Sequence, residues 1–366
     1  MSSLDYFWRY SRQMVLEDVG VEGQDKLRGS RVAIVGLGGL GSQVAMSLAA
    51  MGVGYLRLID FDLVSTPDLH RQLLYTEDDV GYCKAEAAAR RLRSMNSSIL
   101  VEPRCEYFSQ ENAQSLAGDV DLVVDCTDSF QAKYAVNRVC AMLGKPFVFG
   151  SAIEYYGNVA TFEPWGDVCL ECLYPELHDE DYPTCAVAGV LPQCVQVVGS
   201  IQAAEAVRYL LGSPSLLNTL LFVDLKNYSL DRLSIAQNPS CPMKTNRPLV
   251  ELDVGVPRQV CSRNGKLQLL MVLDNKSNIE EVYRKWGLLG SVEKRGELAV
   301  EVRRGEGVYT YTAAGTILGE VDTSVDPTMA KQIMAELAAT ISGSVEGAAN
   351  KQNNPRVWCG RVENPN

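Results

Sequence analysis

Short apolar runs rich in Val, Ile and Leu alternate with longer segments of helical apolar spacing through the first 150 residues. The short runs predict strands at 31–35, 55–59, 99–103, 121–124 and 146–149. The longer segments predict helices at about 6–27, 40–51, 84–95, 110–116 and 129–143. Because strands and helices alternate, we expect a mostly parallel sheet with helices on its faces, which is a Rossmann-like α/β fold.

The pattern changes beyond residue 150. Apolar runs at 157–163 and 221–225 predict antiparallel strands that extend the sheet, with an Ala-rich helix at 195–211 between them. After 238–242 the composition shifts, and Asn264-Gly265 between two apolar runs predicts a hairpin. The remaining pattern predicts strands near 258–261, 267–272, 298–303, 307–312 and 316–320, and helices at 278–287 and about 327–342.

These elements divide the chain into three regions. Residues 1–244 form the Rossmann-like domain with its antiparallel extension, and residues 245–345 form a small α+β domain. In the second region, the order of two strands, a helix and more strands is compatible with a β-grasp module. Residues 346–366, rich in Asn and Pro, are expected to form a flexible tail.

Charge and composition exclude several classes of protein. The formal net charge is -11 and no basic block is present, so we expect no nucleic-acid partner. No apolar run has the length of a membrane span, and the N-terminus lacks the features of a signal peptide, so we expect a cytoplasmic protein without a membrane partner. Its eleven cysteines are then expected to be buried, metal-binding or catalytic rather than paired in disulfides. Only two histidines are available for acid/base chemistry, which favours a reaction that needs no base.

The first predicted strand runs directly into a G-x-G-x-x-G turn that contains Gly36, Gly38, Gly39 and Gly41. The glycines allow a tight turn and a close approach of the backbone to phosphate, and the following helix directs its free N–H groups at the anion. The second strand then delivers Asp60, the acidic residue that such sites use to bind a ribose. The pattern predicts a nucleotide site, and an NAD-dependent oxidoreductase is one class of protein that carries it.

Further stretches accompany this turn in a defined order. They are Arg9-Tyr10-Ser11-Arg12-Gln13, Asp60-Phe61-Asp62, Asp68-Leu69-His70-Arg71-Gln72, Val80-Gly81-Tyr82-Cys83-Lys84-Ala85 and Asp125-Cys126-Thr127-Asp128. Together with the turn, they resemble the E1-like activating enzymes of the MoeB/ThiF type over about residues 6–244. In that family, MgATP adenylates the C-terminal Gly-Gly carboxylate of a ubiquitin-like protein and pyrophosphate is released. A carboxylate is already ionised at neutral pH, so this reaction meets the expectation of chemistry without a base.

The resemblance implies a role for each matching position. ATP would be bound by Gly36, Gly38, Gly39, Gly41, Asp60, Asp62, Arg71, Gln72, Lys84 and Asp128. Within this set, Arg71 and Lys84 would offset phosphate charge and Asp128 would ligate Mg²⁺. Arg12 resembles an arginine that reaches the partner's ATP across a dimer interface, which implies a homodimer. Asp68 stands where the family usually has Asn, and it adds a negative charge near the phosphates.

Two further sets of cysteines match family features. Cys185 lies in a stretch that resembles the crossover segment, whose thiol attacks the adenylate in members that form a covalent intermediate. Cys169 and Cys172 form a C-x₂-C pair, and the family closes a structural Zn²⁺ site with a second such pair. Here the second pair retains Cys241 but has Lys244 in place of the fourth thiolate. The alternatives are zinc completed by His178, Cys261, Cys359 or water, and a set of buried thiols without metal.

Several functions remain open at this level. The ubiquitin-like protein could pass through a thioester on Cys185 to an E2-like conjugating enzyme, and a ubiquitin-fold-like second domain would favour that fate. It could instead be a sulfur carrier for molybdopterin, thiamine or tRNA thiolation. A rhodanese domain around Cys261 is not favoured, because this residue lies on the predicted hairpin. A noncatalytic E1-like scaffold is disfavoured because Arg71, Lys84 and Asp128 are all present.

Overall fold

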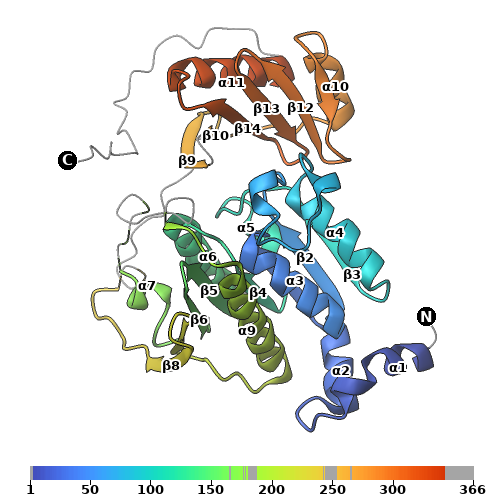
Figure 1. Ribbon diagram of the computed structural model, residues 1–366, viewed down its shortest axis with the longest axis vertical. Helices are drawn as coiled ribbons and strands as arrows, with labels where there is room; N and C mark the ends of the chain where they lie inside the picture. The colour runs from blue at the N-terminus through green and yellow to red at the C-terminus, as the bar shows by residue number, and fades with distance from the viewer. Residues whose placement is uncertain are drawn as a thin grey trace. The chain divides into compact units, whose positions relative to one another are not determined.

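The computed structural model describes residues 3–164, 166–175, 177, 179, 188–241, 243, 254–263 and 266–342. These residues form two compact units, the first mainly within residues 3–243 and the second mainly within residues 254–342 (Figure 1). The predicted boundary between residues 244 and 245 and the predicted tail lie outside the described residues. None of the helices in the described ranges has the length and apolar character of a membrane span.

The first unit is built on a sheet of eight strands in the order β3-β2-β1-β4-β5-β6-β7-β8. The strands are β1 (Arg31–Val35), β2 (Tyr55–Ile59), β3 (Leu100–Arg104), β4 (Leu122–Asp125), β5 (Phe147–Ile153), β6 (Tyr156–Phe162), β7 (Thr219–Asp224) and β8 (Ser229–Ser234). β1 to β5 pair in parallel, whereas β6, β7 and β8 add antiparallel strands. The expected mostly parallel sheet with an antiparallel extension is confirmed.

Helices cover both faces of this sheet. They are α1 (Ser3–Met14), α2 (Gly20–Gly29), α3 (Gly39–Met51), α4 (Lys84–Met95), α5 (Ala113–Ala117), α6 (Phe130–Leu143), α7 (Leu170–Leu173) and α9 (Pro192–Leu211), with 3₁₀ turns η1 (Thr66–Asp68) and η2 (Glu77–Asp79). Successive β1 residues point to opposite faces, and Val32, Ala33, Ile34 and Val35 are all buried. Apolar side chains therefore pack on both sides of this strand, as expected for a parallel sheet.

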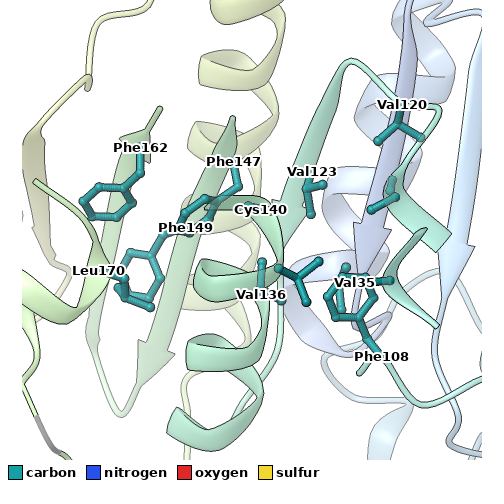
Figure 2. Close-up of a cluster of buried hydrophobic side chains, with 14 of the residues drawn as sticks. Val35, Phe108, Val120, Val123, Val136, Cys140, Phe147, Phe149, Phe162 and Leu170 are labelled. Atoms are coloured by element: carbon teal, nitrogen blue, oxygen red, sulfur yellow. The ribbon is translucent and has the colours of Figure 1, made fainter. Parts of the chain in front are cut away.

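One layer of the core lies between the sheet and α6. Phe147, Phe149 and Phe162 from β5 and β6 pack there with Leu170, and Val136 of α6 lies against the same layer (Figure 2). On the other side of the sheet, α3 packs against α9, and α9 contacts β4, β5 and β6. This packing fixes the ends of β1 and β4, where the chain turns into loops.

Two expectations for the first unit are wrong in detail. The predicted helix over about residues 6–27 is two helices, and Gly20 opens α2 with a φ of +56°, a left-handed conformation that favours glycine. The edge strand β8 was not expected. Its side chains are mostly exposed, and it therefore carries no apolar pattern.

The second unit is a six-stranded sheet in the order β11-β12-β13-β14-β10-β9. Its elements are β9 (Arg258–Arg263), β10 (Lys266–Val272), α10 (Ile279–Trp286), β11 (Val292–Lys294), β12 (Ala299–Arg304), β13 (Gly307–Thr312), β14 (Thr316–Asp322) and α11 (Pro327–Ser342). Both helices pack on a core that contains Trp286, Tyr309, Tyr311 and Leu337. Every pairing is antiparallel, including β10 with β14. The unit is α+β as expected, but the β-grasp alternative is wrong, because a β-grasp module pairs its first and last strands in parallel.

Candidate active site

The Gly-rich turn lies where the strand order of the first sheet reverses. β1 pairs in parallel with β2 on one side and with β4 on the other, so the loops after β1 and β4 leave the sheet side by side. Such a switch point opens a crevice at the carboxyl ends of the strands, and open α/β sheets bind ligands there. The sequence-predicted nucleotide residues lie on the loops after β1, β2 and β4, apart from Gly39 and Gly41 in α3 and Lys84 at the start of α4.

Glycine is required at two positions of the turn. Gly36 has a φ of +86°, and a Cβ there would lie 2.8 Å from the carbonyl oxygen of Cys126 in the loop after β4. A Cβ on Gly41 would lie 1.9 Å from the carbonyl oxygen of Gly36. Helix α3 begins at Gly39, with Gly38 as its N-cap. The turn thus brings the free N–H groups of this helix to the crevice, which is an arrangement that binds phosphate.

Asp60 follows β2 and is bonded to the turn. One of its carboxylate oxygens accepts a hydrogen bond from the backbone N–H of Leu37 at 2.6 Å, and the other accepts from the N–H of Asp62 at 2.7 Å. Burial raises the pKa of Asp60 to about 6, and the negative charge of Asp62 adds to this while Lys84 opposes it. The residue expected to bind ribose therefore also holds the Gly-rich turn in place.

Five of the polar residues near the turn form one group, which we call the loop cluster: Asp62, Asp68, Arg71, Gln72 and Lys84. Lys84 is buried at the start of α4, and its Nζ lies 3.0 Å from Asp62 Oδ2 and 3.6 Å from Asp68 Oδ2. Asp68 Oδ1 accepts from Arg71 Nη2 at 3.2 Å and from Gln72 Nε2 at 3.0 Å. The structure thus brings together Asp62, Arg71, Gln72 and Lys84, four of the residues expected to bind ATP.

The loop cluster is adjacent to the Gly-rich turn. A Cβ on Gly38 would lie 3.7 Å from Gln72 Nε2, and the Tyr75 hydroxyl donates to the carbonyl oxygen of Leu37 at 2.9 Å. The α3 N-terminus and the two cations therefore border the same space. Backbone N–H groups and cations together form an anion site.

Asp128, Arg12 and Cys185 are expected site residues that are not part of the loop cluster. Asp128 is exposed in the loop after β4, on the β4 side of the switch point. Arg12 is exposed in the last turn of α1, and no hydrogen bond or ion pair joins it to another described residue. Cys185, the expected nucleophile, lies outside the described residues.

A disulfide connects the loop cluster to the edge of the sheet. Cys83 and Cys105 are bonded, which corrects the expectation that the cysteines are not paired in disulfides. Cys83 directly precedes Lys84, and Cys105 follows β3. Both side chains are buried, so the bond ties the start of α4 to the end of β3.

Cys169, Cys172 and Cys241 form a compact group of thiols. The Sγ of Cys169 lies 3.9 Å from that of Cys172 and 3.5 Å from that of Cys241. Four sulfurs bound tetrahedrally to zinc at about 2.3 Å stand about 3.8 Å apart, so the three thiols fit three corners of such a site. Buried Glu171 lies between the first two cysteines and accepts from Arg138 Nε at 2.7 Å, which holds the C-x₂-C turn on α6.

None of the residues considered for a fourth ligand has a described side chain. Lys244, His178 and Cys359 are outside the described residues. Cys261 lies on β9, but its side chain is not described. The described residues therefore supply three thiols.

Sequence analysis missed a buried ion pair beside the crevice. Lys133 Nζ lies 3.2 Å from Asp125 Oδ2 and donates to the carbonyl oxygen of Gly150 at 2.7 Å. Gln202 of α9 donates to the carbonyl oxygen of Asp125 at 2.9 Å. These bonds connect α6, α9 and β5 at the end of β4. The sequence did contain a signal for this pair. Lys133 lies on the same helical face as the apolar residues Val136 and Cys140, and a lysine buried there needs a partner because an unpaired buried charge is costly.

Comparison with known proteins identifies the chain. The ThiF family matches residues 10–243. The chain belongs to the ThiF family. A sulfur carrier protein adenylyltransferase of Thermus thermophilus is 41% identical over 256 residues, which are 67% of this chain and 94% of that protein. A SAMP-activating enzyme E1 of Haloferax volcanii is 40% identical over 237 residues, or 64% of this chain and 87% of that protein.

The solved structures agree with this assignment. The crystal structure of E. coli MccB superposes with a TM-score of 0.58 at 25% identity, over 67% of this chain and 74% of that one. The expected resemblance to MoeB/ThiF-type enzymes is confirmed, and this ThiF-family chain is an E1-like adenylyltransferase. The NAD-dependent oxidoreductase alternative is thereby set aside.

Alkylation of the denatured chain without reductant is predicted to leave Cys83 and Cys105 unmodified while free Cys140 reacts. Reduction should lower the free energy of unfolding by about 3 kcal/mol, because the bond closes a segment with a sequence separation of 22. A variant with Cys83→Ser and Cys105→Ser should be insensitive to reductant in urea unfolding. Alkylation of Cys83 before reduction would contradict the pairing.

The raised pKa of Asp60 predicts a pH-dependent stability. Because the folded chain holds this proton more tightly than the unfolded chain, the Asp60 contribution to stability falls as pH rises from about 4 to about 6. The difference in unfolding free energy between Asp60→Asn and wild type should shift in favour of the variant over that range and then become constant. Asp119 serves as a control with the opposite sign, because its hydrogen bond with Arg57 lowers its pKa to about 2, so that its contribution to stability rises with pH. A flat difference for Asp60→Asn in urea titrations would be the contrary result.

Proposed function

We propose that this chain binds MgATP at the crevice and adenylates the C-terminal Gly-Gly carboxylate of a ubiquitin-like protein. The observation that carries the proposal is the position of Gln72 beside Gly38 at the start of α3, with Arg71 and Lys84 held next to Gln72 by their shared contact with Asp68. Arg71 and Lys84 provide cations, and the start of α3 provides N–H donors, on one side of the crevice. Asp60 on the neighbouring loop supplies the acceptor for ribose hydroxyls.

The chemistry follows from the groups at the site. A carboxylate oxygen of the carrier attacks the α-phosphorus of ATP, the bond from this phosphorus to the bridging oxygen of the β-phosphate breaks, and pyrophosphate leaves. The nucleophile is already ionised, so no base is needed, and His70 is exposed with its Nδ1 2.9 Å from the carbonyl oxygen of Pro67. Arg71 and Lys84 offset the negative charge that moves onto the leaving group. The carrier C-terminus and ATP are held together, which supplies the remaining rate enhancement.

Asp128 would hold Mg²⁺, because an exposed carboxylate fits a hard cation that is also bound to phosphate oxygens. The ion would supply charge neutralisation at the phosphates. Arg12 would act on the ATP of a second copy in a homodimer. Trp8, Val15 and Leu16 in and after the same helix are exposed apolar residues, which supports a protein contact there.

The proposal ends at the acyl adenylate. The two relatives differ in their names, one activating a sulfur carrier protein and the other described as a SAMP-activating E1. A ubiquitin-like sulfur carrier and a ubiquitin-like modifier require the same first step. Transfer to an E2-like protein is no longer favoured by the second unit, because this unit is not a β-grasp module. Thioester formation on Cys185 stays a prediction, since this residue lies outside the described residues.

We also propose that Cys169, Cys172 and Cys241 hold a structural Zn²⁺ with one further ligand. Three thiols that lie within 4.8 Å of one another fit the preference of zinc for sulfur. The ion would connect the C-x₂-C turn at α7 to the segment after β8. No role in the adenylation chemistry is assigned to it.

The purified chain should catalyse exchange of pyrophosphate into ATP only when a Gly-Gly-ending ubiquitin-like protein is present. Lys84→Met should reduce this exchange by about 100-fold, because it removes a buried cation from the leaving group. Arg91→Met is the matched control, since it removes an exposed cation from the same helix and should leave exchange near wild type. Exchange without any carrier, or full exchange by Lys84→Met, would refute the proposed function.

Metal analysis of the purified protein should find about one zinc per chain. Cys172→Ser should lose the metal and lower the unfolding temperature. Cys140→Ser is the control, because Cys140 is a buried free thiol outside the cluster and its replacement should leave the zinc content unchanged. Wild-type protein prepared without chelators that contains no zinc would show the group to be buried thiols.

A further inference from the structure

Asp68 connects three side chains of the loop cluster, Arg71, Gln72 and Lys84, to one another. Its Oδ1 accepts from Arg71 Nη2 and Gln72 Nε2, and its Oδ2 lies 3.6 Å from Lys84 Nζ. The carboxylate is itself held, because Ser65 donates to Oδ2 from its backbone N–H at 3.2 Å and its hydroxyl at 2.7 Å. This buried carboxylate therefore contacts all three side chains. The Pro67 carbonyl oxygen also accepts from Arg71 Nη1 at 2.8 Å, and Asp62 also pairs with Lys84.

The Asp68 carboxylate also fixes the orientation of the Gln72 side-chain amide. A carboxylate only accepts hydrogen bonds, so the Gln72 Nε2 group must face Asp68. The amide oxygen then faces elsewhere, and it is buried without a hydrogen-bond partner among the described residues. Gln72 consequently adds an acceptor to the site, and an acceptor attracts cations and donors rather than phosphate.

The charges of the site are unfavourable for a nucleotide without a metal ion. Lys84 and Arg71 are paired with Asp62 and Asp68, and Asp60 adds a third carboxylate. If a triphosphate attracts Arg71 and Lys84, these cations neutralise less of the negative charge of the carboxylates. Removing partners from buried charges is costly, so a further cation must accompany the nucleotide.

We infer that Asp68 is a positioning residue that makes nucleotide binding at this site depend on a divalent cation. The inference rests on the proposed function, because it takes the crevice as the ATP site. Its carboxylate orients Arg71, Gln72 and Lys84, and its charge opposes the phosphates unless Mg²⁺ accompanies them. An Asn at this position would keep an oxygen that accepts from Arg71 and Gln72 and would remove the charge, whereas its amide nitrogen would not accept from the Ser65 N–H or from Lys84.

Titration calorimetry of ATP in EDTA and in Mg²⁺ tests this. Asp68→Asn should bind ATP in EDTA at least about tenfold more tightly than wild type, because one negative charge near the phosphates is gone. The Kd in Mg²⁺ should change far less, so the metal dependence of binding shrinks. Asp68→Glu retains the charge and should keep the wild-type preference for Mg²⁺. Circular dichroism checks that each variant is folded.

Asp79 provides a matched control within the same chain. It closes the second 3₁₀ turn with the same bonds, from the Thr76 N–H at 2.8 Å and the Thr76 hydroxyl at 2.9 Å, and it pairs with Arg90 rather than with the loop cluster. Asp79→Asn should therefore leave the ratio of the two Kd values unchanged.

The outcomes separate this inference from the proposed function. If wild type binds no ATP in either buffer, the proposed function fails and the inference fails with it. If wild type binds MgATP but Asp68→Asn binds no more tightly in EDTA, only the inference is overturned. It is also overturned if Asp79→Asn gives the same change, or if Asp68→Asn and Asp68→Glu both lose binding in both buffers, since Asp68 would then have a structural role alone.

Discussion

The parallel pairing of β1 with β2 on one side and β4 on the other is the constraint on which the site depends. In this register Val35 lies opposite Ile59 and opposite Asp125, so all three strands end at the same level. Gly36 then donates to the carbonyl oxygen of Ile59, and Cys126 donates to that of Val35. The chains leave the sheet so close together that Gly36 cannot carry a side chain. The crevice, the start of α3 and the position of Asp60 all follow from this register.

Much of the first unit could be predicted from the sequence because its parallel strands are buried on both faces. β1 and β2 lie at the predicted residues 31–35 and 55–59, since a short apolar run between polar turns has few other interpretations. The exposed edge strand β8 has no such signal. In the second unit the order of elements was largely predictable, but the same order is compatible with several strand pairings. Its topology depends on which strand pairs with β10, and a pattern of apolar residues does not specify that pairing.

At the candidate site, the identities of several residues could be predicted from the sequence, but the contacts between them could not. The glycines, Asp60, Arg71 and Lys84 could be named in advance, because each belongs to a continuous motif with a chemical reason for its residue types. The connection of Arg71 and Lys84 through Asp68 could not be predicted, since it depends on how the loop after β2 returns to α4. The Cys83–Cys105 bond and the Lys133–Asp125 pair likewise join segments whose approach only the folded chain determines.

The buried position of Lys84 suggests why the cations are kept paired before a nucleotide arrives. A lysine this deeply buried is costly to keep charged unless carboxylates accompany it, and Asp62 and Asp68 fulfil that condition. In the proposed reaction, phosphate would take the place of these carboxylates, and the exchange would be reversed when pyrophosphate leaves. Asp62 and Asp68 then compete with the product for Lys84 and Arg71. On this proposal, the carboxylates that oppose binding of the triphosphate would also favour departure of pyrophosphate, so the same charges would limit how tightly the site holds substrate and product.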